Sequence, residues 1–473
     1  MIELPDYKLN EEISQDYHSF LYRGTRKSDN KPVLIETFLT EFDTPIQAAQ
    51  FRQEFSIIKN LKSEGFIKAY DTQNFRDGLA LILEDFPGEP LYKNINILHN
   101  DIIKFLFVAI QLSKALSEIH HANIIHKEIK PKNIFLNQDT GVVKFIGPGL
   151  SSILTRENEH IYNPDVLHDS LPYMSPEQTG RMNRTMDYRT DFYSLGVVFY
   201  EIMTGTLPFY SDNPLELFHS HIAITPEAPI RINSKIPEAI SSIIMKMLAK
   251  NPEDRYQSAG GLKADLEECL NQIETTGKIK PFLPGIKDIS DKLNIPQKIY
   301  GRDKEISLLM AAFDRVSRSA SELTLVSGYA GIGKTALINE IHKPIVQQKG
   351  YFISGKFDRL QLNMPYSAII QAFKDLIRQI LTEDQHRIKK WRAQFNEGLG
   401  NNGRIITDVI PELKLIIGEQ PEVQDLGFEE SQNRFNLVFR TFVNIIAEAS
   451  HALVIFLDDL QWADSASLNL LEV

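Results

Sequence analysis

A glycine-rich segment with a lysine and a hydroxyl residue lies at residues 328–335, GYAGIGKT. Its spacing, G-x-x-x-x-G-K-[ST], lets the backbone fold tightly, so that successive amides point at an anion. The glycines that permit this turn are Gly328, Gly331 and Gly333. Lys334 would supply positive charge to the β- and γ-phosphates of a nucleotide, and Thr335 would offer a hydroxyl to Mg²⁺. The segment predicts a site for ATP with Mg²⁺, with an ordinary glycine turn as the alternative.

Two adjacent carboxylates follow an apolar run near the end of the sequence, in ALVIFLDDLQWAD. The run at residues 453–457 predicts a buried strand that delivers Asp458 and Asp459 to the carboxyl edge of a parallel sheet, where phosphates bind. We expect Asp458 to orient Mg²⁺ through water and Asp459 to polarise the water that attacks a nucleotide. A strand that ends in an acidic turn without further function is the alternative.

The elements expected around the glycine-rich segment are those of a parallel α/β sheet. The pattern predicts a helix over 303–320, a strand over 323–328 and a helix over 334–348, an order typical of such a sheet. We therefore expect residues 298–473 to form an α/β three-layer P-loop NTPase domain.

Three segments of this region, IYGRDKEISLLMAAF, GYAGIGKTAL and LDDLQWAD, resemble the STAND signalling NTPases of the AAA-like superclass. The resemblance implies ATP-controlled switching between closed and assembled states, and Gly301 and Arg302 match the entry motif of that group. Because the later strands and the lid of such domains would follow Val473, we expect the domain to be truncated, in a fragment of a longer multidomain protein.

Four segments in the first half occur in the order found in serine/threonine protein kinases: HKEIKPKNIFLN, MSPEQ, DFYSLG and NPEDRYQS. They resemble the catalytic loop, the end of the activation segment, the buried central helix and the turn that carries a paired arginine. The resemblance covers about residues 7–270 and implies an α+β two-lobed protein-kinase-like domain, in which Glu177 pairs with Arg255. It also places Glu128 at the catalytic base, Lys130 at a phosphate contact and Asn133 at a magnesium ligand.

Several positions depart from the kinase pattern in ways that oppose phosphoryl transfer. The third strand, PVLIET, has Glu36 where kinases carry a lysine for the phosphates, while its expected partner on the next helix remains an acid, Glu54. Two carboxylates would repel a triphosphate. The metal-binding D-F-G aligns with a segment that begins at Gly147, and Glu128 is one methylene longer than the usual aspartate. These departures predict a pseudokinase.

The hydrophobic pattern agrees with this organisation. Short strand-like runs separated by polar turns fill residues 5–83, where one helix is expected at 47–61, and helical periodicity dominates from 100 to 270. A proline- and glycine-containing stretch at 271–297 lacks periodicity and predicts a linker. The expected domains are therefore 1–270, kinase-like, and 298–473, NTPase.

Composition excludes several classes of protein. The 473 residues with 42% hydrophobic content can bury sizeable cores, and the formal charge of −11 argues against a protein that coats nucleic acid. The lone Cys269 cannot form an intramolecular disulfide, and no stretch offers 18 uninterrupted apolar residues. We expect a cytoplasmic protein without a membrane segment.

Three functions remain open at this stage. The first is a signalling protein in which an ATP-binding switch is coupled to an impaired kinase-like domain, with other signalling proteins or further domains of a longer chain as partners. The overall layout resembles the N-terminal part of large bacterial sensors that carry histidine-kinase modules further along. The second is an unconventional serine/threonine kinase that uses Glu128 and Asn133 and is regulated by the NTPase. The third is a scaffold that does not hydrolyse nucleotide.

Overall fold

The computed structural model describes most of the chain: residues 4–15, 19–39, 55, 59, 61, 63–75, 78–99, 101–146, 152–153, 169–179, 186–211, 213–289, 301–317, 321–329, 331–338, 351–358, 365–381, 385–424, 427–448 and 452–471. The helix predicted at 47–61 lies mostly outside these residues. Glu54 and Gly147 lie outside them as well.

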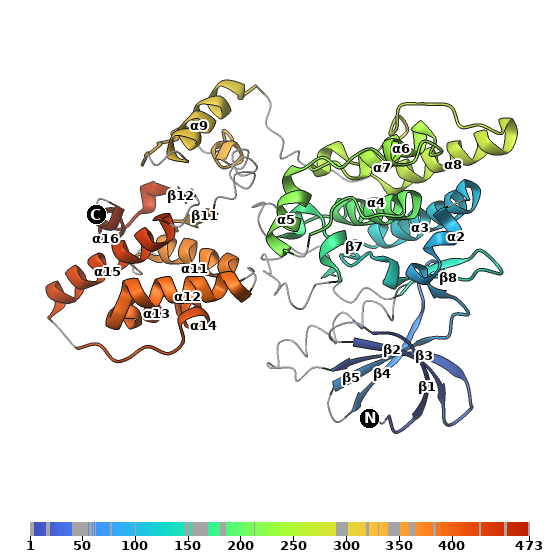
Figure 1. The fold of residues 1–473 in the computed structure, drawn as a ribbon, viewed down its shortest axis with the longest axis horizontal. Helices are drawn as coiled ribbons and strands as arrows, with labels where there is room; N and C mark the ends of the chain where they lie inside the picture. Colours follow the sequence, from blue (N-terminus) through green and yellow to red (C-terminus); the bar gives the residue numbers. More distant parts are fainter. Residues whose placement is uncertain are drawn as a thin grey trace.

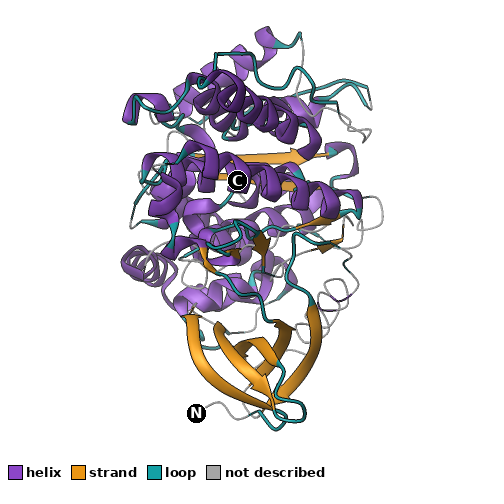
Figure 2. Ribbon diagram, turned by 90° about the vertical axis from the view of Figure 1, so that its right-hand side faces the viewer, coloured by secondary structure: helices purple, strands orange, loops and turns teal. Residues whose placement is uncertain are grey.

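The first lobe is an antiparallel sheet in the order β1-β2-β3-β5-β4, drawn in blue in Figure 1 and seen below the helices in Figure 2. Its strands are β1 (Tyr7–Gln15), β2 (Ser19–Arg26), β3 (Pro32–Leu39), β4 (Ala69–Phe75) and β5 (Gly78–Glu84). Strand β3 is central and pairs with β2 and β5, so Glu36 lies opposite Leu21 on one side and Leu81 on the other. This placement matches the strand-rich first lobe that the sequence predicts.

Helices dominate the second lobe, as the 3.6-residue periodicity predicts. They are α2 (Ile95–His99), α3 (Ile102–His121), α4 (Arg189–Thr204), α5 (Pro214–Ala223), α6 (Pro229–Ile232), α7 (Glu238–Met247) and α8 (Ala259–Thr276). Short strands accompany them: β6 (Glu89–Pro90), β7 (Ile124–Ile125), β8 (Ile134–Leu136), β9 (Val143–Phe145) and β10 (Ser152–Ile153). Helix α8 continues to Thr276, inside the stretch predicted to be linker.

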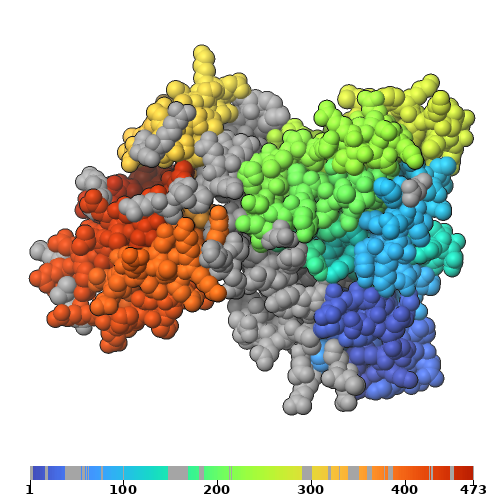
Figure 3. Space-filling view, in the orientation of Figure 1, coloured from blue at the N-terminus to red at the C-terminus, as the bar shows by residue number. Residues whose placement is uncertain are grey.

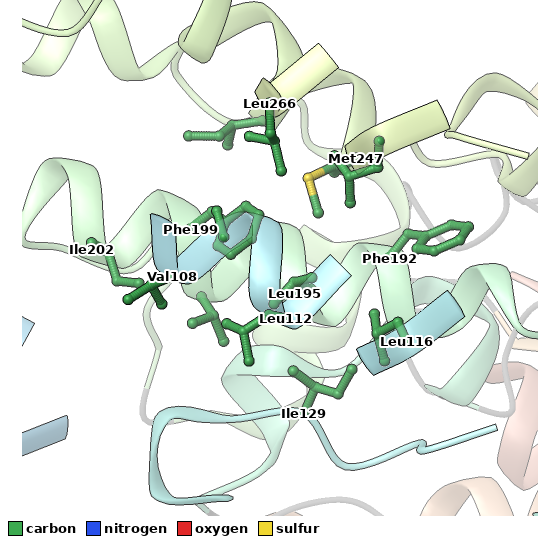
Figure 4. Packing of buried hydrophobic residues seen from close by; sticks show 14 of the residues in the cluster. Val108, Leu112, Leu116, Ile129, Phe192, Leu195, Phe199, Ile202, Met247 and Leu266 are labelled. Carbon is green, nitrogen blue, oxygen red and sulfur yellow. The ribbon is translucent and has the colours of Figure 1, made fainter. Parts of the chain in front are cut away.

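The core of this lobe is apolar and closely packed. Side chains of α3, α4, α7 and α8 meet there (Figure 4), among them Leu112, Phe199, Met247 and Leu266. Helix α4 is buried along nearly its whole length, as its continuous apolar run predicts. Gly196 of α4 is required by the packing, because a Cβ at this position would come within 2.8 Å of the Met247 Cβ. A rigid helical platform therefore supports the loops between these elements.

The second domain has its own core, formed by other residues. Its elements are α9 (Asp303–Val316), β11 (Tyr351–Lys356), α11 (Ser367–Leu381), α12 (Gln385–Leu399), α13 (Gly403–Val409), α14 (Lys414–Ile417), α15 (Phe428–Glu448), β12 (Leu453–Asp458) and α16 (Ser465–Leu471). Figure 3 draws this part of the chain from yellow to red. Strands β11 and β12 pair in parallel, as an α/β domain requires.

Two predictions for the strands of this domain are wrong. Residues 323–328 form no strand, since among the described residues they are hydrogen-bonded to no strand of the domain. Two of its three apolar side chains are exposed, Leu323 to 87% and Leu325 to 73%, while Val326 is half-buried and packs in an apolar cluster. Strand β12 has the predicted position but is not buried, since its residues are half-buried and Ile455 is 37% exposed. A parallel strand becomes buried only when helices cover both faces of its sheet.

Candidate functional site

The glycine-rich segment 328–335 forms a turn that leads directly into a helix. Gly331 and Gly333 have φ angles of 80° and 93°, which side chains with a Cβ rarely adopt. The helix begins at Lys334. The Lys334 ammonium donates to the carbonyls of Gly328 at 2.9 Å and Tyr329 at 3.1 Å. The segment thus has the backbone conformation and the cation that a phosphate-binding loop needs.

The carboxyl end of β12 meets this loop. The Thr335 hydroxyl donates to Asp458 Oδ2 at 3.0 Å, although the two residues are 123 positions apart in the sequence. The other oxygen of Asp458 accepts from the backbone amide of Asp459 at 2.9 Å. The fold therefore brings Thr335 and Asp458, each predicted from the sequence, into direct contact.

Asp459 directly follows β12 and adopts a left-handed backbone conformation, with a φ of 55°, which is uncommon for a residue other than glycine. Its carboxylate accepts from Gln461 Nε2 at 3.1 Å and lies 3.5 Å from Lys356 Nζ. Lys356 was not among the predicted site residues. It ends β11 and lies opposite Asp458 in the parallel register. The rule that functional groups gather at the carboxyl edge of a parallel sheet identifies it only once β11 is known to lie beside β12.

The donor atoms at this edge suit Mg²⁺. A hydroxyl and a carboxylate are hard oxygen ligands, and Mg²⁺ typically takes one or two of these while it keeps waters and phosphate oxygens. Among the described residues, no group of three or more His, Cys, Asp or Glu side chains forms a closed metal site. Thr335 and Asp458 would thus hold a metal together with a nucleotide.

In the loop at residues 126–137, Glu128 is held from several sides. Its Oε1 atom accepts from Lys130 Nζ at 2.9 Å and from the Ser170 hydroxyl at 3.1 Å, and Lys130 Nζ also donates to Ser170 Oγ at 3.0 Å. The Asn133 amide donates to the Glu128 carbonyl at 3.0 Å. The structure therefore brings together the three loop residues predicted from the sequence. Ser170 was missed because nothing in its local sequence indicates that it contacts this loop.

A buried carboxylate anchors the start of the loop. Asp191 of α4 accepts from the backbone amides of His126 at 2.9 Å and Lys127 at 2.8 Å, and its Oδ2 lies 2.8 Å from His120 Nε2. These bonds hold Lys127 at a φ of 66°, a conformation that is costly without such support. Burial lowers the pKa of His126. The loop is thus fixed to the central helix.

The predicted pair of Glu177 and Arg255 is present and buried. Arg255 donates from Nη1 to Glu177 Oε1 at 2.6 Å and from Nη2 to Oε2 at 2.8 Å. Burial alone would raise the pKa of Glu177, but the charge and hydrogen bonds of Arg255 outweigh burial and lower it. The Thr190 hydroxyl also donates to Glu177 at 2.7 Å. The pair joins the end of the activation segment to α4 and to the turn before α8.

The fold and both loops define a protein with a two-lobed kinase domain followed by a P-loop ATPase domain. The protein kinase domain model matches residues 7–267, and the AAA ATPase domain model matches residues 298–473. Because the first match covers more than half of the chain, the chain belongs to the protein kinase family, and an AAA ATPase domain follows its kinase domain.

The proteins that this chain resembles include both histidine and serine/threonine kinases. The hybrid signal transduction histidine kinase G of Dictyostelium discoideum is 34% identical over 459 residues, which cover 79% of this chain and 13% of that protein. Histidine protein kinase 1 of Candida albicans is 26% identical over 416 residues, which cover 78% of this chain and 17% of that protein. A probable serine/threonine-protein kinase of Clostridium perfringens is 31% identical over 280 residues, or 57% of this chain and 39% of the relative. The chain therefore spans a small part of the length of the first two.

A kinase domain joined to an AAA ATPase domain, with signalling kinases among the relatives, indicates a signal-transduction protein. Both domain types imply ATP as a ligand. Among the described residues, none of the helices is long and apolar enough to cross a bilayer.

Proposed function

We propose that this protein is an ATP-dependent signalling switch in which the second domain binds ATP with Mg²⁺ and the kinase domain is impaired in phosphoryl transfer. The observation that carries the proposal is the 3.0 Å contact between the Thr335 hydroxyl and Asp458. It joins a loop of phosphate-binding conformation to a strand end that carries carboxylates.

Each residue of the second site has a defined task. The amides of the loop around Gly331 and Gly333 bind phosphate oxygens, and Lys334 neutralises their charge. Thr335 and Asp458 hold the metal. Asp459, whose carboxylate is oriented by Lys356 and Gln461, accepts a proton from the attacking water. With these residues the second domain has two states, one with bound ATP and one after hydrolysis. A STAND-type switch requires two such states.

The impairment of the kinase domain follows from Glu36. Strand β3 places this carboxylate in the middle of the first-lobe sheet, between β2 and β5. A negative charge at this position opposes the charge of a triphosphate. The kinase domain would then act through its binding surfaces, with other signalling proteins or further domains of a longer chain as partners.

An active unconventional kinase is the second candidate, and the geometry of Glu128 favours it. The carboxylate is fixed by Lys130 and Ser170, as a proton acceptor for a substrate hydroxyl would have to be. Lys130 also retains its position as a phosphate contact.

Two measurements on the full chain separate these candidates. ATP binding in the presence of Mg²⁺ is measured by calorimetry for the wild type, Lys334→Ala and the control Lys304→Ala, whose side chain is exposed on α9. We expect only Lys334→Ala to lose at least about tenfold in affinity, since a charge-assisted contact to phosphate contributes at least about 1.4 kcal/mol. Unchanged affinity in Lys334→Ala would contradict the switch.

The second measurement is the intact mass after incubation with ATP and Mg²⁺ or Mn²⁺. The proposal predicts no added phosphate. Phosphate that appears in the wild type and disappears in Asn133→Ala would establish the active kinase instead.

A further inference from the structure

The stretch after α8 has the composition of a linker but packs against the kinase domain. Gly277 has a φ of 70° and ends α8, and the chain then turns back along the helix (Figure 1). Ile279 and Phe282 pack against the main apolar core of the second lobe. We call residues 278–289 the strap. The packing of these two half-buried side chains against the core distinguishes the strap from a free linker.

A pair of buried polar groups holds the middle of the strap. Asp265 of α8, itself buried, accepts from the Gly285 amide at 2.6 Å and from the Tyr256 hydroxyl at 2.6 Å. Gly285 has a φ of 87°. The strap therefore crosses α8 where a glycine permits the backbone to turn toward a carboxylate.

The end of the strap is held by Asp288 at the start of α8. Its Oδ2 accepts from the Gln257 amide at 2.5 Å, and its Oδ1 accepts from the Ser258 hydroxyl at 2.8 Å. Ser258 is the N-cap of α8 and accepts from the Gly261 amide at 2.9 Å. A Cβ at Gly261 would come within 2.3 Å of Asp288, so the carboxylate occupies a notch that a glycine leaves open. A negative charge at this position also suits the helix dipole.

Gln257, whose backbone amide donates to Asp288, connects the strap to the activation segment through further hydrogen bonds. Gln257 donates from Nε2 to the Arg255 carbonyl at 2.8 Å and accepts from Arg189 Nη1 at 2.8 Å. The backbone carbonyl of Gln257 accepts from the Tyr188 hydroxyl at 2.8 Å. Arg255 forms the buried pair with Glu177. A continuous chain of hydrogen bonds thus runs from Asp288 through Gln257 to the end of the activation segment.

We propose that the strap couples the nucleotide state of the ATPase domain to the activation segment, through the contact of Asp288 with Gln257 and Ser258. This inference rests on the proposed ATP-dependent switch. The ATPase domain follows the strap in the chain. A change in the position of the ATPase domain therefore acts on Ile289 and Asp288 before the rest of the strap. Release of Asp288 would leave the Gln257 amide and the Ser258 hydroxyl without their acceptor and would loosen the turn that carries Arg255. Such coupling requires two states of the strap. In one, Asp288 contacts Gln257 and Ser258, and in the other these contacts are broken.

Hydrogen exchange measured by mass spectrometry on the full chain tests this proposal. Wild type, Asp288→Ala, Asp288→Asn and Lys287→Ala are compared with and without ATP and Mg²⁺. Lys287 is the matched control because it neighbours Asp288 and is exposed. Circular dichroism verifies that each variant is folded.

We expect ATP to change the exchange of residues 255–262 in the wild type and in Lys287→Ala. In Asp288→Ala, exchange of residues 255–262 and 278–289 should accelerate at least about tenfold, as the loss of hydrogen bonds to a charged group predicts, and ATP should no longer change it. Asp288→Asn, which keeps one acceptor oxygen, should be intermediate.

Three results would overturn the proposal: a strap that exchanges in the wild type as fast as an unfolded chain, unchanged protection in Asp288→Ala, or an ATP effect that persists in that variant. Calorimetry on the same samples tells a failure of the proposed switch apart from a failure of the proposed coupling. If ATP does not bind, the proposed switch fails. If ATP binds but residues 255–262 do not respond, only the coupling fails.

Discussion

Lys250 is a lysine whose ammonium lies among aromatic and carbonyl groups of the second kinase lobe. Its Nζ donates to the Ser220 carbonyl at 3.1 Å and lies 4.4 Å from the centre of the Phe209 ring. Burial and the nearby charge of Arg255 lower the pKa of Lys250 to about 7. The folded state therefore binds this proton less tightly than the unfolded state, in which lysine has its ordinary pKa of about 10.4.

This difference predicts how stability depends on pH. Between pH 7 and 10 the unfolded chain holds more protons at this residue than the folded chain, so the free energy of unfolding rises with pH. Urea denaturation at pH 7, 8 and 9 should show this rise in the wild type. In Lys250→Met the rise should be smaller, and an identical pH dependence in the two proteins would contradict the assignment.

Glu36 supports a second prediction at the residue scale. Glu36→Lys reverses the charge on β3, so ATP affinity of the kinase domain should increase by at least about tenfold, equivalent to about 1.4 kcal/mol. The measurement is calorimetry in the Lys334→Ala background, which isolates the kinase domain. Glu36→Gln removes the charge without adding a cation and should have a smaller effect. If neither variant gains affinity, the acid on β3 does not oppose the nucleotide.

At this scale the sequence predicted the residues that belong to contiguous motifs. Lys334, Thr335 and Asp458 were predicted from the motif spacing, and the structure brings Thr335 and Asp458 into contact; their roles in nucleotide binding remain predictions. Lys356 and Ser170 were missed, since Lys356 reaches the site through the register of β11 with β12 and Ser170 through the path of the activation segment. Such contacts are set by tertiary structure, which local sequence does not encode.

Among the elements, the close approach of α4 and α7 depends on Gly196. Gly196→Ala would insert a methyl group 2.8 Å from the Met247 Cβ and should destabilise the domain by about 1–3 kcal/mol, the usual cost of overpacking. Gly260, in the first turn of α8, is the matched control. Its nearest atom to an added Cβ is the Ser258 Oγ at 3.8 Å, so Gly260→Ala should stabilise the domain by about 0.5 kcal/mol. Chemical denaturation measures both, and equal effects would contradict the packing argument.

Helices were predicted better than strands. The helical periodicity predicted over residues 100–270 is present in the structure as helices such as α3, Ile102–His121, and α4, Arg189–Thr204, because helical periodicity is a local property. The strand predicted at 323–328 did not form, since a strand also needs a neighbour that no local pattern supplies. The linker prediction for 271–297 overlooked the strap, whose polar contacts are made to residues distant in the sequence.

For the whole molecule, the two domain types and their order were predicted because each is marked by motifs that are specific in themselves. The family matches confirm both. The domain boundaries remain predictions. The described residues of the two domains form separate apolar cores, which predicts that they unfold in separate transitions.

Calorimetric unfolding of the full chain tests this organisation together with the location of ATP binding. ATP with Mg²⁺ at about 100 times its dissociation constant stabilises the domain that binds it by about 2.7 kcal/mol. We expect the transition of the ATPase domain to move to higher temperature while that of the kinase domain stays in place, because the phosphate-binding loop lies in the former and Glu36 in the latter. Lys334→Ala should abolish the shift. A shift of the kinase transition that persists in Lys334→Ala would place ATP in the kinase domain and support the active kinase.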